Sequence, residues 1–147
     1  MELYTDGAAS GNPGPGGYGV VLKFNGHRKE LSEGFKKTTN NRMELLAVIV
    51  GLESIKNKDL LVNIYSDSKY VVDAINLKWL QSWQANNFKK KANVDLWQRF
   101  LQVYNPSRHK FHWVKGHADN VENNRCDELA VEASKSSFLK TDEGFNN

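Results

Sequence analysis

Four acidic residues of this sequence stand where apolar segments begin or end, so a fold could bring them together from different elements. Asp6 follows a short apolar run and precedes a glycine-rich stretch, and Asp67 follows a longer apolar run. Glu44 lies near the start of a third apolar segment, and Asp127 lies in the last one. Carboxylates held close together repel one another unless a cation lies among them, and oxygen-only ligands favour Mg²⁺ or Mn²⁺ over zinc. The four acidic residues therefore suggest a metal site.

Each of these carboxylates, taken alone, also has a purely structural interpretation. Asp6 precedes Gly7, and Asp-Gly is a common hairpin signal. Glu44 would be favoured in the first turn of a helix by the helix dipole, and Asp67 could cap the helix that follows it. A carboxylate just past the end of a central strand is equally where open α/β sheets bind ligands. Only the combination of the four carboxylates favours a metal-binding role over these structural roles.

The chemistry that such a site could perform is hydrolysis at phosphorus. Two cations about 3.5–4 Å apart can activate water and stabilise a leaving oxygen in an in-line displacement. Asp6, Glu44 and Asp67 would bind the first cation, and Asp127 could complete the shell of the second. Cys126 is the only cysteine, so an intramolecular disulfide and a cysteine-based zinc cluster are excluded.

Length and composition predict one domain over residues 1–147, with a loosely ordered polar tail at 136–147. A net charge of +3 permits a polyanionic partner without requiring one. The chain begins directly in a strand pattern without a signal segment, and it holds no apolar run long enough to cross a bilayer. We therefore expect a cytoplasmic protein, without a membrane partner.

Hydrophobic periodicity predicts an α/β fold. The expected strands are residues 1–6, 18–24, 27–35, 60–65 and 110–115, and the expected helices are residues 41–55, 69–75, 77–83, 94–103 and 121–135. Three strands in a meander followed by two helix-joined strands imply a five-stranded mixed sheet, with an antiparallel meander, parallel strands and helices on both faces. The ends of the first and fourth strands, which carry Asp6 and Asp67, should then be neighbours.

A second feature is the mixture of aromatic and basic residues between positions 79 and 91. Lys89, Lys90 and Lys91 follow a segment that contains Trp79 and Trp83. Interleaved cations and aromatic rings are typical of surfaces that bind nucleic acid strands. A solvated basic face is the alternative interpretation of the three lysines.

Six motifs together resemble bacterial type 1 ribonuclease H. They are TDGAASGNPGPGGYG at 5–19, TTNNRMEL at 38–45, YSDSKYV at 65–71, NVDLWQR at 93–99, WVKGHADN at 113–120 and NRCDELA at 124–130. They lie in the order of the family and span nearly the whole chain. The resemblance implies a ribonuclease H-like fold and a metal-dependent endonuclease, for which we expect Mg²⁺ as the cofactor and a monomeric state. Such an enzyme cuts the RNA strand of RNA–DNA hybrids and leaves 5′-phosphate and 3′-hydroxyl ends.

The resemblance also assigns roles to individual residues. The four catalytic and metal-binding carboxylates of the family fall on Asp6, Glu44, Asp67 and Asp127, and its loop histidine falls on His117. The contacts of the family to the RNA strand fall on the loop from Gly7 to Asn12 and on Asn40 and Lys69. Its phosphate pocket for the DNA strand falls on Asn12, Thr39 and Asn41. Its aromatic wall falls on Trp79 and Trp97.

Two positions depart from the pattern of the family. Lys69 stands at a position that is often Gln. The basic protrusion at residues 84–93 is several residues shorter than in the long-handled members and keeps only Lys89, Lys90 and Lys91, which weakens the expectation of tight hybrid binding through it. The alternatives to a hybrid nuclease are a hybrid-binding module without catalysis and another nuclease of this fold, such as a junction resolvase or an integrase core.

Overall fold

The structure, a computed structural model, describes residues 1–115 and 120–145 of the chain. Its elements in chain order are β1 (Glu2–Ala9), β2 (Gly14–Phe24), β3 (His27–Thr38), α1 (Asn40–Glu53), β4 (Val62–Ser66), α2 (Lys69–Asn76), α3 (Trp79–Ala85), α4 (Val94–Val103), β5 (His109–Trp113) and α5 (Val121–Ser134). Their order agrees with the order predicted from the sequence.

The strands form one mixed sheet in the order β3-β2-β1-β4-β5. β1, β2 and β3 form an antiparallel meander, while β1, β4 and β5 run parallel, with Leu3 opposite Ile64 and Ile64 opposite Phe111. The predicted mixed sheet is confirmed. β1 continues three residues past Asp6, where we expected it to end, but its parallel pairing with β4 runs to Tyr4 opposite Tyr65, so Asp6 and Asp67 both lie just past the paired stretch and are neighbours, as expected.

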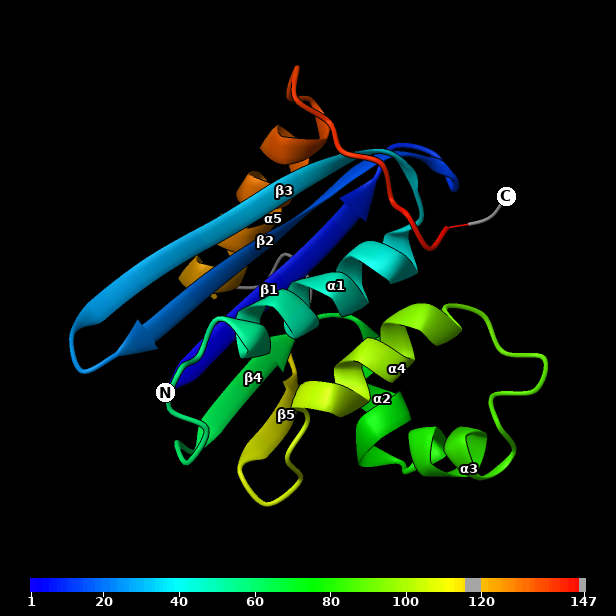
Figure 1. Cartoon of the computed structure of the whole chain (residues 1–147). Coiled ribbons are helices and arrows are strands. Elements are labelled where there is room, and N and C mark those ends of the chain that lie inside the picture. Colours follow the sequence, from blue (N-terminus) through cyan, green and yellow to red (C-terminus); the bar gives the residue numbers. More distant parts are fainter. Residues whose placement is uncertain (116–119, 146–147) are drawn as a thin grey trace.

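Helices cover both faces of the sheet (Figure 1), as predicted. α1 lies on one face, where Leu3 and Val20 are fully buried. α5 lies on the other face, where Tyr4 and Val21 pack against Cys126 of the helix. Alternate residues of β1 and β2 therefore supply two separate layers of core. α4 packs beside α1, α2 lies next to β4 and β5, and α3 lies beyond α2 (Figure 1).

The glycine-rich segment differs most from expectation, because most of it belongs to strands. Pairing of β1 with β2 continues to Ala9 opposite Gly16, which leaves a short connection at residues 10–13. Gly19 shows why glycine is needed: a Cβ there would lie 2.2 Å from the carbonyl oxygen of Cys126. Glycine thus lets α5 approach the sheet closely, an effect that a turn-based interpretation does not anticipate.

The C-terminal segment after α5 returns to the domain. Lys140 exchanges backbone hydrogen bonds with Gly34 and Lys36, at 2.9 and 2.8 Å. The carboxylate of Asp142 accepts from Arg42 Nε and from Thr38 Oγ1, both at 2.7 Å. These contacts anchor part of the segment that we expected to be loosely ordered, and its order in solution stays a prediction.

Among the described residues, no helix combines the length and the apolar character that crossing a membrane requires.

Candidate active site

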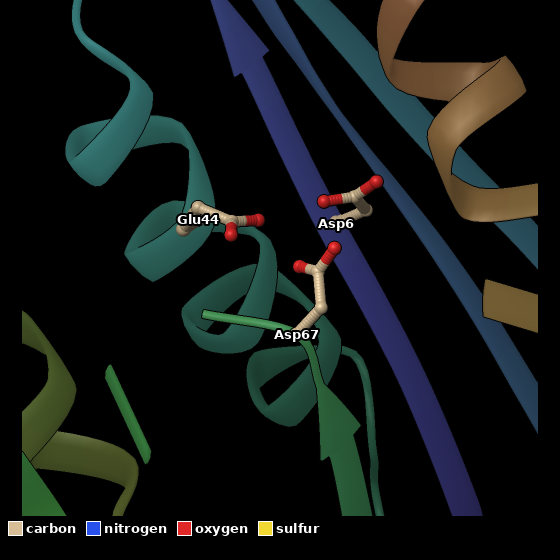
Figure 2. A group of neighbouring side chains, drawn as sticks. All are labelled: Asp6, Glu44 and Asp67. Atoms are coloured by element: carbon tan, nitrogen blue, oxygen red, sulfur yellow. The ribbon is translucent and has the colours of Figure 1, made fainter. Parts of the chain in front are cut away.

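Three of the four predicted carboxylates converge at the edge of the sheet. Asp6 comes from β1, Glu44 from α1 and Asp67 from the turn after β4, and Figure 2 shows their side chains pointing toward one another. One carboxylate oxygen of each lies within 4.8 Å of the others. Asp6 and Glu44 are buried, and Asp67 is half-buried. A group of three acids this close, two of them shielded from water, is a candidate metal site.

The backbone of Gly7 joins two of the carboxylates. Its N–H donates to Oε1 of Glu44 at 2.5 Å and to Oδ1 of Asp6 at 2.9 Å. A Cβ on Gly7 would lie 2.3 Å from the backbone nitrogen of Glu44, so only glycine allows α1 to approach β1 this closely. The Asp-Gly pair therefore serves close packing at the site, and the hairpin interpretation of this pair is wrong.

The other two structural interpretations also fail. The N-cap of α1 is Thr39, which places Glu44 beyond the first turn, where the helix dipole no longer explains a carboxylate. The expectation that Glu44 lies in the first turn is therefore wrong. The N-cap of α2 is Ser68, whose side chain accepts from the N–H of Val71 at 3.2 Å, so Asp67 does not cap this helix.

Burial changes the acidity of the group. It raises the pKa of Asp6 to about 7; the hydrogen bond with Glu44 opposes this rise, and the negative charge of Asp67 adds to it. The pKa of Glu44 rises well above its usual value, first because of burial and then because of the charge of Asp6. Without a cation, both carboxyl groups are therefore protonated more readily than ordinary carboxyl groups in water.

Asp127, the fourth predicted carboxylate, lies across the same cleft. The cleft has a volume of about 240 Å³ and a polar lining that includes Asp6, Glu44, Asp67 and, from α5, Asp127. Asp127 does not belong to the close group of three. Its position suits a separate part of a metal site or a contact made through water.

Asn123 of α5 also lines this cleft, and our sequence interpretation missed it. Its Nδ2 lies 3.5 Å from the carbonyl oxygens of Thr5, in the middle of β1, and of Tyr65, near the end of β4. Its Oδ1 is buried and has no hydrogen-bond partner among the described residues. A buried acceptor without a partner suggests a site for a donor or a cation. In the sequence, only its place four residues before Asp127 pointed to it.

The residues predicted to bind substrate next to α1 lie close together. Asn12 Oδ1 accepts from the N–H of Asn40 at 3.1 Å, and Asn40 Oδ1 accepts from the N–H of Ala9 at 3.0 Å. Thr39 caps the helix, and the exposed Asn41 follows in its first turn. The loop at residues 9–12 and the start of α1 are thus joined into one polar surface, where the helix N-terminus favours anions.

The predicted aromatic wall is only partly available. Trp79 is 45% exposed, whereas Trp97 is fully buried, with its Nε1 donating to the hydroxyl of Tyr70 at 2.9 Å. Contact between Trp97 and a bound strand is therefore excluded in this conformation, and that prediction is wrong. The cause is the amphipathic pattern of α4, which turns Trp97 inward together with Leu96 and Phe100.

The basic segment connects α3 to α4 and projects away from the sheet (Figure 1). Phe88 is buried and anchors it. Lys89, Lys90 and Lys91 are exposed, and the ammonium of Lys91 lies 4.9 Å from the ring centre of Trp83. The structure is compatible with both a substrate contact and a solvated basic face, so the role of these lysines stays a prediction.

His117 lies outside the described residues, so its predicted role is untested. The nearest described residues before and after it, Lys115 and Asn120, both line the cleft that holds the carboxylates. Lys69, the remaining predicted contact, is exposed, with its ammonium 4.8 Å from the ring centre of Trp113.

Comparison with known proteins agrees with this geometry. A family model described as RNase H matches residues 1–135. A ribonuclease H of Desulforamulus reducens is 59% identical over 147 residues, which cover 97% of this chain and 92% of that protein. One of Trichodesmium erythraeum is 51% identical, with coverage of 99% and 95%.

Solved structures show the same likeness. LC9-RNase H1 superposes with a TM-score of 0.76 at 31% identity, over 91% of this chain and 71% of that one. LC11-RNase H1 in complex with an RNA/DNA hybrid superposes with a TM-score of 0.65 at 29% identity, over 91% of this chain and 96% of that one.

Proposed function

The chain belongs to the RNase H family, and on this premise we propose that its four predicted carboxylates, Asp6, Glu44, Asp67 and Asp127, bind two Mg²⁺ ions. The activity that comes with the family is endonucleolytic hydrolysis of the RNA strand of RNA–DNA hybrids by a metal-dependent mechanism, leaving 5′-phosphate and 3′-hydroxyl ends. The observation that carries the assignment is the group of three carboxylates within 4.8 Å at the edge of the sheet.

The residues of the site fit a divalent cation. All the ligands offered are oxygens, as Mg²⁺ requires, and Mn²⁺ would be accepted by the same set. Burial, and then the charge of neighbouring carboxylates, raises the pKa of Asp6 and of Glu44, and a cation would stabilise the ionised form of both. The unpartnered Oδ1 of Asn123 adds an acceptor in the same cleft, suited to a water that accompanies the ion.

When bound, two cations activate a water and stabilise the leaving oxygen of the phosphodiester. The residues of the chain position the metal ligands and transfer a proton. The N–H of Gly7 holds one oxygen each of Asp6 and Glu44, and the ionised form of Glu44, which burial disfavours, would be favoured in the filled site. Without a cation the carboxylates repel a phosphate backbone, so bound metal should strengthen the binding of substrate. We assign His117 to proton transfer at the departing 3′-oxygen.

Recognition of the hybrid would be divided between its two strands. Gly7, Asn40 and Lys69 would contact the RNA strand beside the carboxylates, where 2′-hydroxyl groups distinguish RNA from DNA. The polar surface of Asn12, Thr39 and Asn41 would hold a phosphate of the DNA strand at the start of α1. This surface is supported by the hydrogen bond between Asn12 and the backbone of Asn40.

Trp79 alone would then face the sugars of the DNA strand, because Trp97 is buried. A flat apolar surface is unfavourable for a 2′-hydroxyl, which would be crowded and poorly hydrated there. We therefore expect RNA–RNA duplexes to be poor substrates. The exposed lysines 89–91 would add phosphate contacts farther along the duplex.

We further propose that residues 1–147 act as one monomeric domain in the cytoplasm. A single sheet with helices on both faces supports the first part. The single, buried cysteine is compatible with a reducing compartment. Sedimentation of the purified protein tests the oligomeric state.

Four single variants test the metal assignment: Asp6→Asn, Glu44→Gln, Asp67→Asn and Asp127→Asn. The first three should lose cleavage of a labelled hybrid by more than a hundredfold and should lose Mg²⁺ binding measured by calorimetry. Asp127→Asn should lose activity only in part, because a water can replace this ligand. Full activity of any of the first three would overturn its assignment.

A further inference from the structure

We propose that Trp113 is a positioning residue that fixes the backbone of Asp67 and orients the ammonium of Lys69 beside it. The inference rests on the proposed function, because it takes Asp67 as a metal ligand and Lys69 as a contact to the RNA strand. It adds a residue to which no catalytic or binding role has been assigned above.

Trp113 stands where the two parallel strands beside the site end together. It is the last residue of β5 and lies opposite Ser66, the last residue of β4. Its indole Nε1 donates to the carbonyl oxygen of Asp67 at 3.1 Å. The ladder between the strands continues with the N–H of Val114, which donates to the carbonyl of Ser66 at 2.9 Å. The indole thus extends the contact of β5 with this segment by one residue, to the metal ligand itself.

This hydrogen bond constrains the point where the chain turns from β4 into α2. On the other side of the turn, the N–H of Ser68 donates to Oγ of Ser66 at 3.1 Å. The carbonyl and the side chain of Asp67 share one Cα, so holding the carbonyl also limits the direction of the carboxylate. That direction matters because an oxygen of Asp67 must stay within 4.8 Å of those of Asp6 and Glu44.

The face of the same ring has a second contact. The ammonium of Lys69 lies 4.8 Å from the ring centre, within the range of a cation–π interaction. Lys69 is exposed and long, so its cation would otherwise sample many positions. Trp113 is itself 45% exposed, so the face of its ring is accessible to the Lys69 ammonium. The N–H edge of the ring holds a metal ligand, and its face holds a substrate cation.

Two substitutions separate these contacts. Trp113→Phe removes the N–H donor and keeps an aromatic face for Lys69. Mg²⁺ binding to the free enzyme, measured by calorimetry, should weaken by roughly three- to tenfold, and the Mg²⁺ concentration for half-maximal cleavage should rise equally, while KM for hybrid changes little. Trp113→Leu also removes the aromatic face, so KM should rise as well. Lys69→Met should raise KM and leave Mg²⁺ binding unchanged.

Trp79→Phe is the matched control, because Trp79 is also 45% exposed and is proposed to contact substrate away from the metal ligands. This variant should change KM without changing Mg²⁺ binding. Asp67→Asn is the reference for loss of the site. If Asp67→Asn loses Mg²⁺ binding while Trp113→Phe binds Mg²⁺ within twofold of wild type, the inference about Trp113 is wrong and the metal site stands. If Asp67→Asn binds Mg²⁺ like wild type, the proposed metal site itself is wrong.

A measurement on the wild-type protein avoids any effect of substitution on folding. During a Mg²⁺ titration followed by NMR, the indole N–H resonance of Trp113 should shift with the same midpoint as Mg²⁺ binding. The indole resonance of Trp79 should not shift. A Trp113 resonance that stays constant while Mg²⁺ binds would overturn the inference.

Discussion

Replacing Asp6 by Asn should abolish cleavage and at the same time stabilise the metal-free fold. The amide has nearly the same shape as the carboxylate, but it carries no charge. In the folded protein, burial and the charge of Asp67 raise the pKa of Asp6 from 3.8 to about 7. Each pKa unit corresponds to about 1.36 kcal/mol, so the ionised form of Asp6 costs roughly 4 kcal/mol of stability.

The sign and the pH range follow from linkage. The folded pKa of Asp6 lies above its unfolded value, so the folded state binds the extra proton and stability falls as pH rises from about 4 to about 7. Between pH 5 and pH 7 this loss is roughly 2–3 kcal/mol, and above pH 7 it is complete. Asp6→Asn lacks this loss, so its advantage over the wild type should be larger at pH 8 than at pH 5 by that amount.

Urea unfolding in EDTA at pH 5 and pH 8 measures this difference. In 10 mM Mg²⁺ the wild type should recover stability at pH 8, because the cation replaces the proton, whereas the variant should respond little. An advantage of Asp6→Asn that does not grow between pH 5 and pH 8 would refute the electrostatic argument. Cleavage within tenfold of wild type would refute the assignment of Asp6 as a metal ligand.

Three further sets of substitutions test the basic segment, His117 and the C-terminal segment. Replacing lysines 89–91 by Ala should raise KM more than it lowers kcat and should flatten the salt dependence of KM, because phosphate contacts are made equally in ground and transition states; unchanged KM and salt slope would make these lysines a solvated face. His117→Ala should lower kcat by roughly one to three decades at saturating substrate with little change in KM, and an unchanged kcat would remove His117 from the mechanism. Asp142→Ala should lower the free energy of unfolding by roughly 1–3 kcal/mol, since it removes one of the partners of the buried Arg42 while Asp95 remains; stability equal to wild type would show that the C-terminal segment is not held in solution.

The sequence was sufficient to predict the architecture because its periodic patterns are strong. The near-continuous apolar run before Asp67 indicates a central strand covered on both faces, and the order of elements leaves few topologies. The convergence of Asp6 and Asp67 follows from parallel pairing alone. The position of Glu44 was predicted only approximately, because the sequence did not show whether Thr39 or a later residue begins the helix.

Other features depend on tertiary contacts that local patterns do not contain. Trp97 belongs to a motif expected at the substrate surface. Its side chain is nevertheless buried, and its indole N–H donates to the hydroxyl of Tyr70 in the core. Gly7 looked like a turn residue, although its lack of a side chain lets α1 approach β1, and Gly19, in a predicted strand, likewise lets α5 approach β2. The buried ion pairs of Arg42 join residues that are distant in sequence, so no local pattern could indicate them.

Cleavage of three matched duplexes tests the central claim most directly. The purified protein, with Mg²⁺ or with EDTA, would be incubated with an RNA–DNA hybrid, an RNA–RNA duplex and a DNA–DNA duplex of one sequence, each labelled on both strands in turn. The account predicts Mg²⁺-dependent internal cuts in the RNA strand of the hybrid alone, with 5′-phosphate and 3′-hydroxyl ends, and at most slow cutting of RNA–RNA. Comparable rates on the hybrid and on RNA–RNA, or cutting of the hybrid in EDTA, would contradict it.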